Sequence, residues 1–97
     1  MRVISRKALR KFWERHADSE VPLRAWFKET KEAAWQQPSE IKERYASASF
    51  LANDRVVFNI KGNDYRLVVA VRYDFGLVFV RFVGTHAEYD KIDATTI

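Results

Sequence analysis

Three side chains that could transfer protons or contact an anion lie close together near the end of the sequence. His86, Tyr89 and Asp90 are three and four residues apart, so a helix would bring them to one face. Gly84 and Thr85 precede them as a turn residue and a helix cap. Histidine has an unperturbed pKa of about 6.5 and exchanges protons near neutrality. The pattern fits a small acid–base cluster, and it also fits a histidine with a structural role.

An arginine lies just upstream, on a segment with the alternation of a β-strand. Leu77, Phe79, Arg81 and Val83 share one side of this expected strand. An arginine among apolar neighbours is costly unless it is paired or faces an open cleft. We interpret Arg81 as directed at an anion on the open face of a sheet, with a structural salt bridge as the alternative.

The elements that position these residues follow from a change in hydrophobic period. Apolar residues at helical spacing predict one helix over Ser5 to Ala17 and a second from Asp18–Ser19 to a point before Pro38. The short connection predicts an antiparallel helix hairpin. Three tryptophans at helical positions are assigned to core packing: Trp13, Trp26 and Trp35.

The second half of the chain predicts three antiparallel strands, at Arg55–Lys61, Tyr65–Tyr73 and Leu77–Val83, joined by turns at Gly62-Asn63-Asp64 and Asp74-Phe75-Gly76. On the middle strand one side suits burial under the hairpin: Tyr65, Leu67, Val69, Val71 and Tyr73. The opposite side carries Arg66, Val68, Ala70 and Arg72. Between the halves the pattern is loose, with a single helical turn around Ser39 to Tyr45.

Composition limits the functional classes. The 97 residues predict one domain over positions 1–97, and the absence of cysteine excludes disulfides, thiolate metal sites and a cysteine nucleophile. The net charge of +4 favours an anionic partner, nucleic acid first. No apolar run approaches the roughly 18 residues of a membrane helix, so we expect a cytoplasmic protein.

The expected first helix carries a basic stripe, which is either a solvated face or a surface for RNA or an acidic partner: Arg6, Lys7, Arg10, Lys11 and Arg15. A metal site is not expected, because His16 and His86 are the only histidines and no carboxylates have ligand spacing. We interpret His16 as a helix-surface or packing residue.

Two long blocks of the sequence carry a resemblance to a known family. Val57–Leu67 reads VFNIKGNDYRL and Phe82–Asp93 reads FVGTHAEYDKID, with PSEIK at Pro38–Lys42 as a weaker third block. In this order and at this chain length they resemble the HigB-type toxins of bacterial type II toxin–antitoxin modules, in the RelE-like group of mRNA interferases.

The resemblance implies an α+β fold, with a strand-helix-helix-strand-strand-strand core, an antiparallel sheet backed by the helix hairpin and a short C-terminal helix. It also implies an endoribonuclease that cleaves mRNA on the translating ribosome without a cofactor. The implied partner is a HigA-like antitoxin with a helix-turn-helix domain. The toxin would contact operator DNA only through this antitoxin.

For such a ribonuclease we assign Arg81 and Arg66 to the phosphate, because a guanidinium offers paired donors to phosphate oxygens. His86 is the candidate general acid or base, and Tyr89 is a second proton carrier or a stacking surface. Whether Arg66 and Arg81 share a face depends on strand register. Four further residues are predicted to bind RNA: Lys61, Asn63, Arg72 and Lys91.

Two other functions fit the same residues. A non-catalytic RNA- or ribosome-binding module would use the basic helix and the arginines without needing His86. A toxin with the same fold could instead inhibit DNA gyrase, since one fold supports several activities. Loss of RNA cleavage on truncation of His86 or Tyr89 separates the enzyme from both alternatives.

Overall fold

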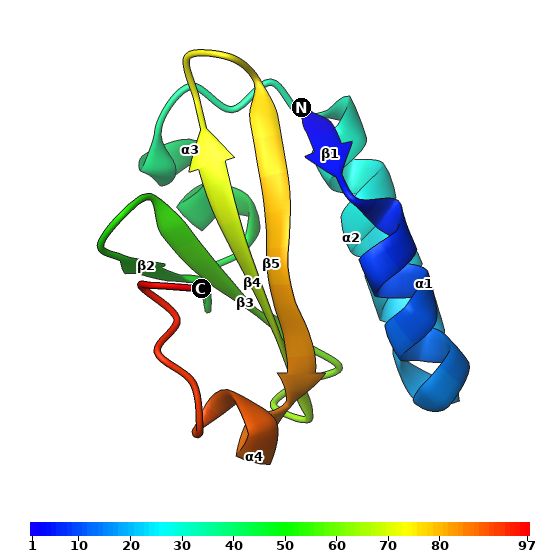
Figure 1. Cartoon of the computed structure of the whole chain (residues 1–97). Coiled ribbons are helices and arrows are strands. Elements are labelled where there is room, and N and C mark those ends of the chain that lie inside the picture. Colours follow the sequence, from blue (N-terminus) through cyan, green and yellow to red (C-terminus); the bar gives the residue numbers. More distant parts are fainter.

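The computed structural model describes all residues, 1–97 (Figure 1). A short 3-10 turn at Ala17–Ser19 separates the first two helices. The helices are α1 Arg6–Arg15, α2 Glu20–Glu32, α3 Pro38–Arg44 and α4 His86–Tyr89. The strands are β1 Arg2–Ile4, β2 Ser49–Leu51, β3 Arg55–Ile60, β4 Tyr65–Arg72 and β5 Leu77–Thr85.

All strands join one five-stranded sheet in the order β1-β5-β4-β3-β2. The β2–β3–β4–β5 part is an antiparallel meander, as the sequence predicts. The sheet as a whole is mixed, because β1 pairs in parallel with β5. The α+β class and the strand-helix-helix-strand-strand-strand core are confirmed. Helix α3 and strand β2 are additions, and α3 forms where only a single turn was expected.

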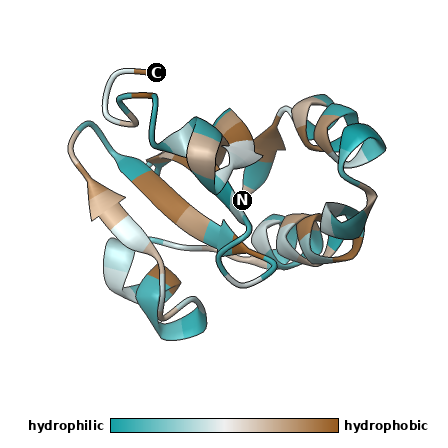
Figure 2. Cartoon of the chain, turned by 90° about the horizontal axis from the view of Figure 1, so that it is seen from below, coloured by the Kyte–Doolittle hydropathy of each residue, from teal (hydrophilic) through white to brown (hydrophobic).

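The main core lies between the sheet and the three longer helices. Leu9 and Phe12 of α1, Leu23 and Trp26 of α2 and Ile41 of α3 are buried in it. The strands contribute Val56, Phe58, Ile60, Tyr65, Leu67, Val69, Val71 and Val78. All three tryptophans are buried, which confirms their assignment to packing. The helical position expected for Trp35 is wrong, because α2 ends at Glu32. Figure 2 shows a long hydrophobic stretch in the sheet, whereas the hairpin helices carry both kinds of residue.

One prediction about β5 is wrong. Val68 pairs with Phe82 and Val69 pairs with Val80, so Arg81 is the extra residue of a β-bulge. The extra residue reverses which side the following residues face. Phe82 therefore lies on the face away from the helices, whereas Val83 packs into the core, opposite to the expected alternation.

The face of the sheet away from α1–α3, which we call the open face, is partly covered by residues 90–97, which follow α4. Ala94 is 6% exposed and forms a small apolar cluster with Val57 and Val68. Phe82 and Tyr89 pack against the same cluster. The chain therefore crosses from the end of β5 back over the middle of the sheet (Figure 1).

The helices are short: α2, the longest, has 13 residues. None of them combines the length and the apolar character that a membrane crossing requires.

Trp26→Ala tests the packing of the hairpin on the sheet. Trp26 is 2% exposed and its ring lies edge-on to Phe58, with the ring centroids 5.5 Å apart. Truncation of such a side chain should lower the free energy of unfolding by about 3 to 5 kcal/mol, measured by urea denaturation. Val21→Ala, at a residue 78% exposed on the same helix, should change it by less than about 0.5 kcal/mol. Equal urea midpoints for the two variants would show that this core is assigned incorrectly.

Candidate active site

Helix α4 is fixed to the end of β5 by a capping box. The backbone N–H of Glu88 donates to Thr85 Oγ1 at 3.1 Å, and the N–H of Thr85 donates to Glu88 Oε1 at 2.8 Å. The hydrogen bond from the Thr85 backbone is the main reason that the pKa of Glu88 lies below its ordinary value. The cap expected at Thr85 is therefore confirmed, and it starts the helix at His86.

His86 joins α4 to the turn between β3 and β4. Its backbone N–H donates to the Asp64 carbonyl at 3.2 Å. The imidazole is exposed, and its Nε2 lies 3.8 Å from Asp90 Oδ1, one helical turn further on. The side chain is thus anchored through its backbone while its ring nitrogens remain accessible to a ligand.

Arg66 and Tyr89 lie beside each other on the open face. The Arg66 guanidinium carbon is 5.9 Å from the centroid of the Tyr89 ring, and Arg66 Nη1 donates to the Asn63 carbonyl at 3.0 Å. No carboxylate pairs with Arg66, so its charge is not neutralised within the chain. The guanidinium has five N–H donors, most of which stay available to a phosphate.

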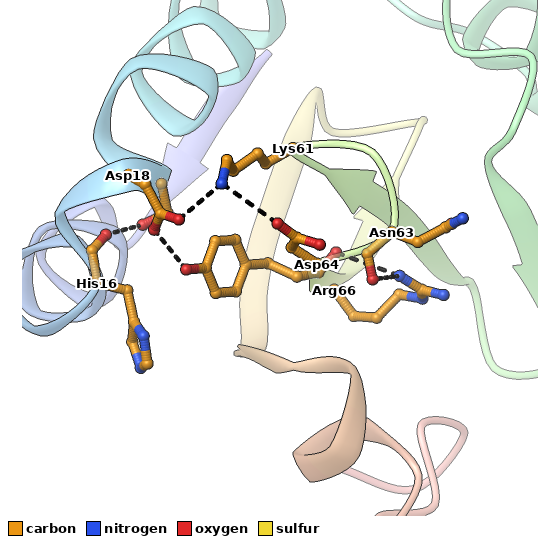
Figure 3. A network of polar contacts seen from close by, with 8 residues as sticks. His16, Asp18, Lys61, Asn63, Asp64 and Arg66 are labelled. Atoms are coloured by element: carbon orange, nitrogen blue, oxygen red, sulfur yellow. Dashed lines mark hydrogen bonds and ion pairs between the residues drawn. The ribbon is translucent and has the colours of Figure 1, made fainter.

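Lys61 lies on the other side of the same turn and points towards the helix hairpin (Figure 3). Its Nζ is 2.8 Å from Asp18 Oδ2 and 3.3 Å from Asp64 Oδ2. The Tyr65 hydroxyl also donates to Asp18. The hydrogen bond from Lys61, followed by that from Tyr65, lowers the pKa of Asp18, and Asp18 in turn raises the pKa of Lys61. This network ties the 3-10 turn to the β3–β4 turn.

The structure does not bring Arg81 to His86. Arg81 lines a separate cavity of about 350 Å³ on the open face, together with Arg72 and Arg55. Its Nε donates to the main-chain oxygen of Ile97 at 3.1 Å, and it forms no ion pair with a carboxylate side chain. The salt-bridge alternative for Arg81 is therefore absent from the structure. Arg81 faces the open side by ordinary alternation with Phe79, and the bulge adds Phe82 to the same side.

Arg66 and the three arginines of this cavity nevertheless lie on one face of the sheet. Arg66 is paired with Gly84, whereas Arg81 sits beside Val68 and Val69, two to three residues further along β4. At ~3.3 Å per residue this is a separation of roughly 7 to 10 Å along the strand. Lys91 is exposed just beyond α4, at the His86 end. An extended ligand of that length can therefore contact both Arg66 and Arg81.

Two residues of this region escaped the sequence reasoning. Arg55 lies directly opposite Ala70 on the neighbouring strand, and paired residues face the same side of a sheet. The alternation that places Ala70 on the open face would therefore have placed Arg55 there too. Asp18 was considered only as a helix cap, and its contact with Lys61 joins residues 43 positions apart. No local pattern reports such a contact. No group of three or more histidine, cysteine, aspartate or glutamate side chains is arranged to hold a metal ion.

A comparison with protein families decides the classification. A model of the HigB toxins, described as the RelE-like toxic component of a toxin–antitoxin system, matches residues 19–92. The chain belongs to this family. An antitoxin is accordingly its partner.

Similar characterised proteins agree with the family assignment. The chain is 30% identical over 96 residues to the mRNA interferase toxin HigB of Escherichia coli K12. The matched residues cover 97% of this chain and 92% of that protein. The mRNA interferase HigB of Shigella flexneri shows the same identity and coverage. The mRNA interferase HigB of E. coli O6:H1 is 22% identical over 94 residues, covering 95% of this chain and 91% of that protein.

Asp18→Asn tests the network that supports the β3–β4 turn. The pKa of Asp18 is lowered from 3.8 in the folded chain, so its contribution to stability is present above about pH 4 and disappears as the pH falls through the lowered pKa. Asp18→Asn should therefore lower the urea midpoint at pH 7, and the difference from wild type should vanish below that pKa. Glu14→Gln, at an exposed residue with no ion pair, is the control. If the urea midpoints of wild type and Asp18→Asn differ by the same amount at pH 7 and below the pKa of Asp18, the role of the Asp18 charge is contradicted.

Proposed function

We propose that this chain is the toxin of a type II toxin–antitoxin system and acts as an endoribonuclease on mRNA. The observation that carries the proposal is an unpaired Arg66 beside the Tyr89 ring at one end of the open face, with the exposed His86 three residues before Tyr89 on α4. The names of the similar proteins, mRNA interferases of E. coli and Shigella, support the same activity.

Cleavage by this cluster needs no group beyond the side chains and the RNA itself. The ribose 2′-oxygen loses its proton and attacks the adjacent phosphorus, and the bond to the 5′-oxygen breaks as that oxygen gains a proton. The products are a 2′,3′-cyclic phosphate and a 5′-hydroxyl. His86 serves as general acid or base in this step. Arg66 stabilises the charge that builds up on the phosphate oxygens.

Tyr89 has two roles open to it in this arrangement. Its ring lies against Arg66, where it can stack on a base, and its hydroxyl can carry a proton. The exposed side chains at the same end, Asn63 and Lys91, contact the RNA backbone in our proposal, and Lys61 does so from the turn that Asp18 holds. Arg81 and Arg72 bind phosphate further along the strand.

The partners follow from the same proposal. We infer that the antitoxin is a HigA-like protein with a helix-turn-helix domain and that operator DNA is bound only through it. The mRNA is cleaved while the ribosome translates it, and the protein acts in the cytoplasm.

His86→Ala tests the proposal in cells. New RNA 5′ ends are mapped by primer extension shortly after induction of wild type, His86→Ala and Lys28→Ala, the last at an exposed α2 residue with no ion pair. Wild type and Lys28→Ala should produce 5′-hydroxyl ends within coding regions. His86→Ala should produce them about 10² to 10⁴ times more slowly, because it lacks the proton-transfer group. Circular dichroism checks that it is folded.

Two results would contradict the proposal. Equal cleavage by folded His86→Ala would remove His86 from the site. Growth arrest by wild type with intact mRNA would instead indicate a target such as DNA gyrase.

A further inference from the structure

A cluster of positive charge lies on the open face, outside the His86 end. Arg55 of β3, Arg72 of β4 and Arg81 of β5 line the same 350 Å³ cavity. Asp54 is the only carboxylate among the lining residues, and Asp74 lies 3.8 Å from Arg72 Nε. Positive charge therefore exceeds negative charge around the cavity. The proposed cleavage step, which uses His86 and Arg66, does not involve these arginines.

Two of these arginines already hold one oxygen atom in the way that a phosphate oxygen would be held. Arg55 Nε and Arg81 Nε each donate to the main-chain oxygen of Ile97 at 3.1 Å, and Arg55 Nη2 donates to the same oxygen. Two guanidinium groups from neighbouring regions of the sheet thus converge on one acceptor. Guanidinium groups arranged in this way are paired, charged donors of the kind that bind phosphate oxygens.

The segment that supplies this oxygen is not part of a helix or of the sheet. Residues 94–97, which we call the tail, contain no helix or strand. The tail is held by burial of Ala94 against Val57 and Val68, by packing of Ile97 against the same cluster and by the arginine donors to Ile97. The Asn53 side-chain amide also donates to the Thr95 carbonyl at 2.9 Å. A small alanine buries little apolar surface, so an anionic ligand that binds the arginines can displace the tail.

We propose that Arg55, Arg72 and Arg81 form a second phosphate-binding subsite for the RNA strand, and that the tail occupies this subsite until RNA displaces it. The inference rests on the proposed function for the identity of its ligand. Its place in the fold supports it: the subsite begins at Arg81, roughly 7 to 10 Å along β4 from Arg66, and extends further along the same face as the cleavage cluster. Phe79 at the cavity wall offers an aromatic ring for a base.

Arg55→Gln tests the subsite with a ligand that cannot be cleaved. The probe is a fluorescent single-stranded oligonucleotide of 2′-deoxy residues, whose binding is followed by anisotropy across a range of salt concentrations. Arg55→Gln should weaken binding about tenfold. It should also reduce the slope of log K against log salt by about 0.7, as expected for one lost phosphate contact on a single strand. Lys28→Gln removes the same charge from α2 and should leave the slope unchanged.

Ala94→Gln tests the displacement of the tail without changing the charge of the protein. A polar side chain should not stay between Val57 and Val68, so the tail should detach, visible as increased mobility of residues 94–97 in NMR relaxation. Binding of the oligonucleotide should then tighten at least about threefold, because the subsite no longer has to be vacated. Asn53→Gly is the second variant: it removes the hydrogen bond to Thr95, and glycine accepts the φ of 61° found at Asn53.

The outcomes separate this inference from the proposed function, because oligonucleotide binding requires no cleavage. Weaker binding in Arg55→Gln together with tighter binding in Ala94→Gln and Asn53→Gly supports the subsite, whether or not the wild type cleaves mRNA. Wild-type affinity and salt slope in Arg55→Gln would overturn the subsite. Unchanged affinity in both tail variants, with the tail shown to be mobile, would overturn its role as a competitor.

Discussion

The burial of alternate residues of β4 is the constraint on which the candidate site depends. Leu67, Val69 and Val71 are fully buried against the helices, so the side chains between them must face the other way. Arg66 and Arg72 are therefore held on the open face by the packing of their neighbours. A one-residue slip of this strand would bury both guanidinium groups and expose the core, and the cost of burying unpaired charge excludes it.

Local irregularities at β5 then set what the open face can do. The bulge turns Phe82 to the same side as Arg81, and the capping box at Thr85 begins α4 directly where the strand ends. A side chain at Gly84 would force Phe82 to move, since a Cβ atom there would lie 2.4 Å from the Phe82 ring. The result is one face with two functional parts: proton-transfer groups at the α4 end and arginines at the middle. Because Arg66 and Arg81 pair with no carboxylate, their charges remain available to an anion.

The sequence predicts those features that repeat over several residues. The hairpin helices, the buried tryptophans and the two faces of β4 all follow from hydrophobic period, and the Thr85 cap follows from residue type. Single events are missed because no repeat reports them. The bulge needs one extra residue, and the three residues of β1 are too few to show a period, so only the family resemblance predicts that strand. The contacts of Asp18 with Lys61 and of Ile97 with Arg55 and Arg81 join distant segments, so only the folded chain brings them together.

The central claim is that the ribose 2′-hydroxyl attacks the adjacent phosphate at the His86–Tyr89–Arg66 cluster. The most direct test uses purified ribosomes programmed with an mRNA that carries one 2′-deoxy nucleotide, placed either immediately 5′ of the mapped cleavage bond or one nucleotide downstream. The account predicts no cleavage in the first case and normal cleavage in the second. Cleavage of both mRNAs at the same bond would contradict it, because the attacking oxygen would then have to come from water or from the protein.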